Sequence, residues 1–468
     1  MSITAAIVLA AGEGTRMKSH TPKVLHSLAG KTFLQRVMSA VSATNPQSVA
    51  VVVRHQAEKV SEAALTYNSQ AMIVHQDEIP GTGRAVQCAF QELSSLGHVQ
   101  GTIVITAGDM PMLDGQTLTN LVSEHEASGN VATILSCNLD NPYGYGRIIR
   151  DSAGGFIRIV EQKDGSDKEL AVHEVNTSVY AFDAAVLAQS IEKLNSANAQ
   201  GEFYITDALS HARDMGPVGI VTVDNPLRVE GVNDRVQLSK LAKAYNQEIC
   251  EYWMRQGVSI LDPDTTWIDD DAQLEADAVI LPGSYIQGST RVAAEAVIGP
   301  DTTLINAVIE CGARVERSRV EKTHIGENAT IGPWTYLRPG NELAAHTKAG
   351  AFVEMKNAHI DEGTKVPHLS YVGDAHVAHH TNIGGGTITA NYDGVHKHHT
   401  EIGAHVHVGA GNMFVAPVTV GDNVTTGSGS VVRHDVPADA MVYSENTQHV
   451  VENWKPQWER DEESNKEQ

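Results

Sequence analysis

The chain has 468 residues, with 34 lysines and arginines against 57 aspartates and glutamates, and a formal net charge of −23 at pH 7. Binding to nucleic acid or to an anionic membrane relies on an excess of Lys and Arg, so this charge excludes both as the main partner. The length allows two or three domains with a large core. A small anionic ligand stays compatible, because a local basic pocket can form on an acidic protein.

The four cysteines stand far apart, at positions 88, 137, 250 and 311, without a CxxC pair. This spacing argues against a disulfide framework or a structural zinc site and favours a reducing compartment. The N-terminus lacks the features of a signal peptide, and no apolar run approaches the about 20 residues that span a bilayer. We therefore expect a cytoplasmic protein without membrane insertion.

The first half alternates short apolar runs with helix-like segments. Val- and Ile-rich runs occupy residues 3–12, 48–53, 71–75, 101–111 and 130–136, and segments 32–43 and 83–96 have helical composition. Alternating strands and helices with continuously apolar strands indicate a Rossmann-like α/β domain with a parallel, doubly wound sheet. In such sheets ligands bind beyond the carboxyl ends of the strands.

A six-residue period begins after residue 257. Two slips interrupt it, and its apolar positions are Ile268, Leu274, Ile280, Ile286, Val292, Ile298, Leu304, then Ile325, Ile331, Leu337, Leu343, then Ile402, Val408, Phe414, Val420 and Val432. Helices and ordinary strands do not produce this period. It predicts a left-handed parallel β-helix built from hexapeptide repeats, in which one apolar residue per short side enters a triangular core. A β-sandwich with coincidental spacing is the alternative.

These patterns divide the chain into four parts. We expect a nucleotidyltransferase-type domain over 1–232, a linker helix over 233–256, the β-helix over 257–445 and an acidic, disordered tail over 446–468. The flat outer faces of a triangular prism suit self-association with closed three-fold symmetry, so we expect a homotrimer.

The first candidate site follows the first strand, in "LAAGEGTRMKSHTPK" (residues 9–23). Gly12 and Gly14 allow the backbone to approach a ligand, while Arg16 and Lys23 supply positive charge suited to a triphosphate. A glycine-rich loop alone is weak evidence, and this one matches neither the Walker A nor the GxGxxG pattern.

A metal site is the second expectation for this half. Asp109, in "AGDMP", ends a strongly apolar strand, where a carboxylate suits Mg²⁺; a helix N-cap is the plainer explanation for a lone aspartate. Asn233, in "VEGVND", is a candidate second oxygen ligand.

Together these motifs resemble a known enzyme family. "LAAGEGTRM…PK", "QDEIPGTG", "GDMP", "YGR", "VEQKD", "VNT", "GEFYITD" and "VEGVN" are similar to the sugar-1-phosphate nucleotidylyltransferases. The resemblance is strongest to the bifunctional N-acetylglucosamine-1-phosphate uridyltransferases/glucosamine-1-phosphate acetyltransferases, and it extends to about residue 436. It implies that acetyl-CoA acetylates glucosamine-1-phosphate, and that UTP then gives UDP-N-acetylglucosamine, a cell-wall sugar donor, and pyrophosphate.

The resemblance assigns roles in the N-terminal domain. It implies that Arg16 and Lys23 act on the UTP phosphates and that Asp109 and Asn233 hold Mg²⁺, with Tyr204 and Thr206 near the sugar. The residues implied to bind UTP or the N-acetylglucosamine unit are Leu9, Ala10, Gly12, Gly14, Lys23, Gln76, Gly81, Thr82, Gly146, Glu161, Asn176 and Asn233.

A polar cluster in the β-helix forms the second candidate site. Arg338, Lys356, His368 and Asn382 are separated by near multiples of six, so they stack approximately on neighbouring rungs. Solvated outward positions explain each residue taken singly. Taken together they suit a phosphate clamp beside a histidine, which titrates near working pH and serves as a base.

The resemblance implies that His368 is the general base of acetyl transfer. It places the sugar phosphate against Arg338, Lys356, Tyr371, Asn382 and Lys397, and acetyl-CoA against Asn391, Tyr392, Ala410 and Ser428. Four positions depart from the family pattern: Glu13 replaces a frequent lysine, Ala107 a tyrosine, Ala410 a serine and Glu445 an arginine.

Two other functions share parts of this pattern. A monofunctional hexose-1-phosphate nucleotidylyltransferase has a hexapeptide tail that is structural or allosteric, and the cluster of Arg338, Lys356 and His368 argues against it. Subunits of translation-initiation exchange factors pair degenerate copies of both domains without catalysis, and intact Arg16, Lys23 and Asp109 argue against them.

An insertion, "TANYDGVHKHHTE" (residues 389–401), interrupts the hexapeptide register. Its histidine run suggests metal binding, but we find no carboxylate or cysteine partner at metal-ligand spacing. We expect a loop whose Asn391, Tyr392 and Lys397 serve the acetyl-transfer site, plausibly one shared with a neighbouring subunit. His396, His398 and His399 are then solvated bystanders.

Overall fold

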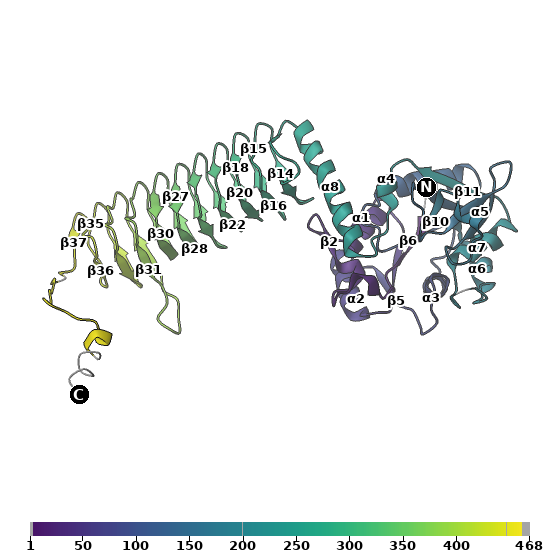
Figure 1. Ribbon diagram of the computed structural model, residues 1–468, viewed down its shortest axis with the longest axis horizontal. Helices are drawn as coiled ribbons and strands as arrows, with labels where there is room; N and C mark the ends of the chain where they lie inside the picture. The colour runs from purple at the N-terminus through teal and green to yellow at the C-terminus, as the bar shows by residue number, and fades with distance from the viewer. Residues whose placement is uncertain (1–2, 199, 446, 461–468) are drawn as a thin grey trace. The chain divides into compact units, whose positions relative to one another are not determined.

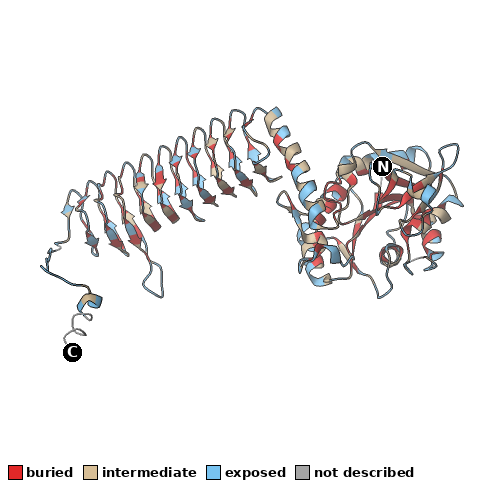
Figure 2. Cartoon of the chain, in the orientation of Figure 1, coloured by how far each residue is buried: buried red, intermediate tan, exposed pale blue. Residues whose placement is uncertain are grey.

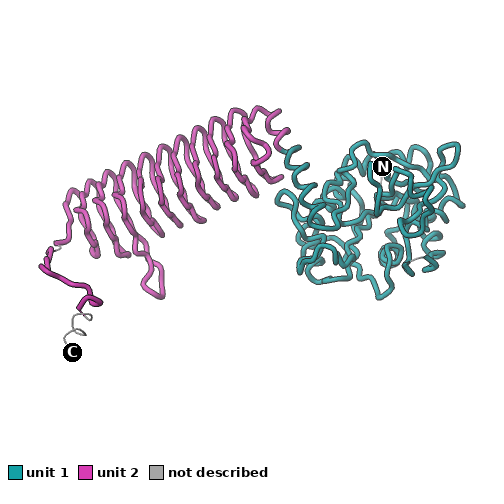
Figure 3. Tube along the Cα trace, viewed as in Figure 1, with its two compact units in different colours: residues 1–249 teal, residues 250–468 magenta. Residues whose placement is uncertain are grey.

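The fold is described from a computed structural model, which describes residues 3–198, 200–445 and 447–460. The chain forms two compact units, Met1–Ile249 (unit 1) and Cys250–Gln468 (unit 2), shown in different colours in Figure 3. Helix α8 (Arg235–Arg255) contains the boundary between them. The four-part division drawn from the sequence stays a prediction.

Unit 1 is built around a nine-stranded sheet with the order β11-β7-β10-β6-β1-β4-β5 and the hairpin β8–β9 joined to β10 (Figure 1). Its strands are β1 (Ile3–Leu9), β4 (Ser48–Val53), β5 (Met72–His75), β6 (Thr102–Ala107), β7 (Ala132–Asn138), β8 (Arg147–Arg150), β9 (Phe156–Val160), β10 (Glu174–Asp183) and β11 (Val218–Val223). The five apolar runs identified in the sequence are β1, β4, β5, β6 and β7. The sheet is mixed, not wholly parallel, because β10 runs antiparallel to β6 and β7.

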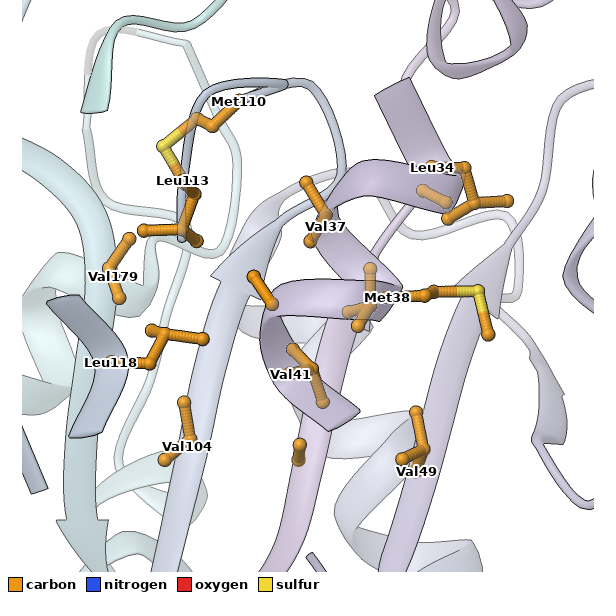
Figure 4. Packing of buried hydrophobic residues seen from close by; sticks show 14 of the residues in the cluster. Leu34, Val37, Met38, Val41, Val49, Val104, Met110, Leu113, Leu118 and Val179 are labelled. Atoms are coloured by element: carbon orange, nitrogen blue, oxygen red, sulfur yellow. The ribbon is translucent and has the colours of Figure 1, made fainter. Parts of the chain in front are cut away.

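Two apolar layers enclose this sheet. One packs against α1 (Phe33–Ser42), α2 (Ala57–Tyr67) and α4 (Gly115–Ala127), and Figure 4 shows part of it. The other packs against α3 (Thr82–Ser95), α6 (Ala184–Glu192) and α7 (Ile205–Arg213). The remaining elements of the unit are β2 (Ser27–Leu28), β3 (Lys31–Thr32), α5 (Asp167–Leu170), and the 3₁₀ turns η1 (Thr15–Met17), η2 (Lys23–Leu25) and η3 (Pro226–Val229).

Unit 2 is the predicted left-handed parallel β-helix, and its strands pair in parallel with the strand one coil away. Parallel coil-to-coil pairing excludes the sandwich alternative. We number its three sides in chain order. Face 1 holds β12 (Ser259–Ile260), β15 (Val279–Ile280), β18 (Val297–Ile298), β21 (Arg314–Val315), β24 (Thr330–Ile331), β27 (Lys348–Ala351) and β29 (Lys365–His368), and isolated bridges continue it to β35 (Thr425–Thr426) and β37 (Met441–Val442).

Faces 2 and 3 share two long strands, β28 (Glu354–Ile360) and β30 (Tyr371–Val377), which turn the corner between them. Face 2 also holds β13 (Trp267–Ile268), β16 (Tyr285–Gln287), β19 (Thr303–Ile305), β22 (Arg319–Glu321), β25 (Tyr336–Leu337), β31 (Ile388–Ala390), β33 (Met413–Val415) and β36 (Val431–Val432). Face 3 also holds β14 (Gln273–Leu274), β17 (Arg291–Val292), β20 (Val308–Ile309), β23 (His324–Ile325), β26 (Glu342–Leu343), β32 (Thr400–Ile402) and β34 (Val418–Val420).

The hexapeptide positions form the core of this prism. Every apolar residue of the three registers lies buried, and exposed or half-buried neighbours stand beside it in the short strands (Figure 2). The predicted tail is only partly described: residue 446 and residues 461–468 lie outside the described residues, and residues 457–460 are helical. Its disorder stays a prediction. No helix within the described ranges is both long and apolar enough to cross a bilayer.

We predict that Ile331→Ala destabilises unit 2 by about 2–5 kcal/mol, because Ile331 is 1% exposed and its loss leaves a cavity between neighbouring coils. Thr330→Ala, at the adjacent exposed position, is the matched control with an expected effect within about 0.5 kcal/mol. All five tryptophans belong to unit 2, so their fluorescence during chemical denaturation follows this unit alone. Equal midpoints for the two variants would contradict the core assignment.

Candidate active sites

A cavity of about 800 Å³ opens at the carboxyl ends of β1 and β6. The glycine-rich loop after β1, the start of α3 and the segment before α8 all contribute to its wall. The predicted residues that line it are Leu9, Ala10, Gly12, Gly14, Arg16, Lys23, Gln76, Gly81, Thr82, Asp109, Gly146, Glu161, Asn176 and Asn233. Tyr204 and Thr206, which were expected near the sugar, are not among the lining residues.

The loop needs its two glycines, Gly12 and Gly14, for different geometric reasons. A Cβ on Gly12 would meet no atom within 4 Å, so its backbone faces open space in which a ligand can approach closely. Gly14 has φ of +63°, and a Cβ there would lie 2.7 Å from the Cβ of Lys23. A side chain at position 14 would therefore displace Lys23 from the cavity.

Positive and negative groups converge below this loop. The Lys23 ammonium forms an ion pair with Asp109 and donates a hydrogen bond to Asn233 Oδ1 at 3.2 Å, and Arg16 donates to the same oxygen at 2.8 Å. The amide of Val232 donates to the carbonyl of Asp109, which ties the two segments together. The two oxygens predicted to hold Mg²⁺ therefore already point at one cation.

Asp109 is not a helix cap. The nearest helix, α4, is capped by Asp114, which accepts a hydrogen bond from the amide of Thr117 at 2.7 Å. The carboxylate of Asp109 is thus available to the cavity, where oxygen ligands of this type suit a hard divalent cation.

The opposite wall of the cavity is polar and partly desolvated. The amide of Asn176 donates to the carbonyl of Gly146 at 2.9 Å, and the side-chain Nδ2 of Asn176 donates to the hydroxyl of Tyr180 at 2.8 Å. Burial raises the pKa of Glu161 above its ordinary value, and the hydroxyl of Thr206, 3.5 Å away, offsets this only in part. This wall offers hydrogen-bonding groups that suit a sugar.

Tyr204 contacts a residue of the cavity wall, because its hydroxyl accepts a hydrogen bond from the side chain of Gln200 at 2.5 Å. Several lining residues were missed from the sequence, among them Arg54, Tyr145, Ser178, Gln200 and Glu202. Tyr145 and Glu202 lie within or beside recognised motifs, which was the available signal. Ser178 adopts φ of +64°, and no sequence pattern predicts this conformation.

The second site lies on face 2 of the β-helix. Lys356 pairs in register with Gly373, and the backbone amide of Arg338 donates to the carbonyl of Met355 on the next rung. Arg338 and Lys356 therefore lie at the same end of face 2, on adjacent rungs. A Cβ on Gly373 would collide with the Tyr371 hydroxyl, so this hydroxyl lies beside the Lys356 rung position. Arg338 also pairs with Glu354 at 3.0 Å.

Lys397 completes this cluster from the inserted loop. Its contact with Lys356 lowers the pKa of the Lys356 ammonium, and burial adds to this effect. Two adjacent ammonium groups repel each other, so the arrangement favours an anion between them. The sequence prediction that Lys397 joins Arg338 and Lys356 agrees with this geometry.

His368 lies at the corner between faces 1 and 2, which we call the first edge. The amides of Gly386, Gly411 and Gly429 each donate to the preceding rung, so His368, Ala410 and Ser428 occupy equivalent positions along this edge. Asn382 lies on face 1 instead, paired with Lys365 and His407.

The corner between faces 2 and 3, the second edge, carries the other predicted acetyl-CoA residues. Asn391 Nδ2 donates to Asp374 at 2.5 Å, and Asp374 accepts from Asn357 at 2.9 Å. Tyr392, the next loop residue, is 62% exposed. Within one chain, face 2 therefore separates Asn391 and Tyr392 from Ala410 and Ser428.

Two of the loop histidines lie beside carboxylates. His398 pairs with Asp393 at 2.7 Å and His399 with Glu401 at 3.2 Å, so each has a carboxylate partner within the inserted stretch. Both side chains remain accessible to solvent, and the prediction that they are bystanders stays a prediction. Across the described ranges, no group of three or more His, Cys, Asp or Glu residues is arranged to hold a metal ion.

Comparison with known proteins covers nearly the whole chain. Residues 6–170 match the MobA-like NTP transferase domain, and residues 399–434 match the bacterial transferase hexapeptide (six repeats). The chain is 66% identical over 460 residues to the bifunctional protein GlmU of Bifidobacterium animalis subsp. lactis, covering 98% of this chain and 100% of that protein. It is 49% identical over 451 residues to the bifunctional protein GlmU of Paenarthrobacter aurescens, covering 96% of this chain and 91% of that protein.

Glu161 makes the stability of unit 1 depend on pH. Its raised pKa means that the folded unit binds a proton more readily than the unfolded chain, so stability is lost as the pH rises above about 4.5. We predict that Glu161→Gln stabilises unit 1 relative to the parent near pH 8 and has little effect near pH 4, measured by hydrogen exchange of unit 1 peptides.

Glu169→Gln is the control with the opposite sign. Hydrogen bonds from Ser166 and Arg158 lower the pKa of Glu169 to about 2, so this substitution destabilises near pH 8 and loses its effect as the pH falls below about 4.5. An effect of Glu161→Gln that does not vary with pH would contradict the burial argument.

Proposed function

The chain belongs to the family of the bifunctional protein GlmU, and we propose that the cavity of unit 1 and face 2 of unit 2 carry its two reactions. The enzyme acetylates glucosamine-1-phosphate with acetyl-CoA. It then transfers UMP from UTP to N-acetylglucosamine-1-phosphate, giving UDP-N-acetylglucosamine and pyrophosphate. The observation that carries the assignment is the presence of two separate clusters of cationic side chains, one in each unit.

In the unit 1 cavity, a sugar phosphate oxygen attacks the α-phosphorus of UTP in line and pyrophosphate leaves. No covalent enzyme intermediate is needed, so catalysis is positioning and charge neutralisation. Gly12 and Gly14 admit the triphosphate to the backbone, and Arg16 and Lys23 neutralise its oxygens. The wall formed by Gly146, Glu161 and Asn176 orients the acceptor sugar, and Gln76, Gly81 and Thr82 hold the uracil.

Mg²⁺ fits this site through Asp109 and Asn233. The two oxygens already converge on a cation, the Lys23 ammonium, and one carboxylate with one amide suits an ion that completes its shell with water and phosphate oxygens. When bound, the ion neutralises charge that develops on the phosphates.

On the β-helix, the amine of glucosamine-1-phosphate attacks the thioester carbonyl of acetyl-CoA. The N–C bond forms, the C–S bond breaks, and His368 accepts the amine proton and returns it to the departing thiolate. Arg338, Lys356 and Lys397 bind the sugar phosphate, with Tyr371 beside them and Asn382 on the adjoining face. Ala410, where a serine is frequent, and the exposed Glu445, where an arginine is frequent, alter the contacts available to the CoA moiety.

The assembled cluster on face 2 disfavours a monofunctional nucleotidylyltransferase, because a structural tail needs no ammonium groups held in contact. The intact cluster of Arg16, Lys23 and Asp109 in unit 1 likewise disfavours a non-catalytic exchange factor. A product that donates sugar units to the cell wall, UTP and acetyl-CoA as co-substrates, and four cysteines outside any disulfide support a cytoplasmic enzyme of cell-wall synthesis.

We propose a homotrimer that completes the acetyl-transfer site. Trp334, Phe352 and Leu369 form an exposed apolar ridge beside His368 on the first edge, and they are 57%, 58% and 65% exposed. The Trp334 and Phe352 rings stack at 5.3 Å. Packing this ridge against a second copy would bring the partner's second edge, with its loop, toward His368.

Reciprocal variants test the two reactions in one coupled assay containing glucosamine-1-phosphate, acetyl-CoA, UTP and Mg²⁺. We predict that Asp109→Asn lowers uridyl transfer at least about 100-fold and leaves acetyl transfer unchanged. His368→Ala should lower the acetyl-transfer kcat about 10²- to 10⁴-fold and leave uridyl transfer unchanged. His324→Ala, an exposed imidazole on face 3, is the control; normal acetylation by His368→Ala would remove the base assignment.

We predict that Phe352→Asp converts a trimer into single chains, because a charge on the apolar ridge opposes its burial. Sedimentation velocity over a range of concentrations measures this, with Leu261→Asp, at an exposed leucine away from the ridge, as the matched control. Sedimentation of the parent protein as a single chain, or an intact trimer in the Phe352 variant, would contradict the proposal.

A further inference from the structure

The half-buried imidazole of His376 connects three rungs of face 3. His376 Nε2 lies 3.0 Å from Asp361 Oδ2, and its Nδ1 lies 2.5 Å from Glu401 Oε1. His376 and Glu401 are directly opposite in the pairing of β30 with β32. One ring therefore bridges two carboxylates that stand on opposite sides of it along the prism.

This geometry requires the imidazolium form. Both partners are acceptors, and a neutral imidazole has only one N–H, so it would leave a lone pair facing a carboxylate. Burial lowers the pKa of His376, but the hydrogen bonds that its ring donates to Asp361 and Glu401 outweigh this effect, and the net pKa is raised. The bridge is therefore a charge-assisted pair of hydrogen bonds.

The bridge extends to the inserted loop. The second oxygen of Glu401 lies 3.2 Å from His399 Nε2, and His399 is the last loop residue before β32. At the other end of the loop, Asn391 is held by Asp374. Lys397 lies between these two anchors and contacts Lys356.

We propose that the chain Asp361–His376–Glu401–His399 positions the loop so that Lys397 meets the phosphate of glucosamine-1-phosphate. His376 is thereby a positioning residue for the acetyl-transfer reaction, acting through Glu401 and His399. This inference rests on the proposed role of Lys397 in binding the sugar phosphate.

The positioning depends on pH through one proton. The titratable groups that face His376 are Asp361, Glu401 and, through Glu401, His399; His359 is its neighbour on the preceding rung, where it lies 3.7 Å from Glu342. Because the pKa of His376 is raised in the folded state, the bridge is intact at lower pH and is lost as the pH rises through that value. The KM for glucosamine-1-phosphate should then rise.

The test is a kinetic comparison of full-length variants. His376→Gln, which cannot donate to both carboxylates, should raise the KM for glucosamine-1-phosphate about three- to thirtyfold, with kcat changed less than about twofold and uridyl transfer unchanged. His376→Arg keeps a permanent cation with several donors, so its KM should stay low and should rise less with increasing pH than the KM of the parent. His359→Gln, at the paired position one rung away, is the matched control.

A double variant separates positioning from general destabilisation. If His376 acts through Lys397, His376→Gln should add less than about twofold to the KM of Lys397→Ala. Tryptophan fluorescence of unit 2 verifies that each variant is folded. The inference is overturned if His376→Gln lowers stability without changing KM, or if the two substitutions multiply; an unchanged KM in Lys397→Ala alone would instead refute the proposed phosphate role of Lys397.

Discussion

The six-residue period of the β-helix is the constraint on which the second half of the molecule depends. Each rung sends one apolar side chain per face into the core, and residues such as Ile331, Leu337 and Leu343 are buried there. The interior is therefore occupied by close-packed side chains. Chemistry is confined to outward positions, where residues from successive rungs align along a face or an edge, and this is how His368, Ala410 and Ser428 come to share one edge.

The two units meet the problem of binding a phosphate in different ways. In unit 1, Lys23 is held by Asp109 and Asn233, so its charge is partly neutralised before a ligand arrives. In unit 2, Lys356 contacts Lys397, and this neighbouring ammonium lowers the pKa of Lys356. In the proposed function, a bound phosphate would relieve the repulsion between the two ammonium groups, so the position of the loop that carries Lys397 would affect the affinity for the sugar phosphate.

The sequence was most informative where one period or one motif fixes the backbone. The hexapeptide register placed the core of unit 2, and the glycine-rich loop, Gln76 and Asp109 all line the predicted cavity, because strand ends in an α/β sheet meet at one edge. It was least informative where long-range pairing decides the outcome. The antiparallel β10 and the carboxylate partners of His376 depend on residues brought together only by folding.

The inserted loop shows how such unforeseen contacts acquire a function. Residues 392–399 leave the prism at the second edge and are exposed or half-buried, and a loop of this length has many conformations to lose on ordering. Two contacts limit that freedom. The His376 imidazolium bridges Asp361 and Glu401 where the chain returns to the prism, and Asn391 donates to Asp374 where the chain leaves it. Both partners are charged in the bonds of the imidazolium, whereas the Asn391 amide is neutral, so the imidazolium is the more effective anchor. It also differs from the amide in depending on the protonation of a titratable ring.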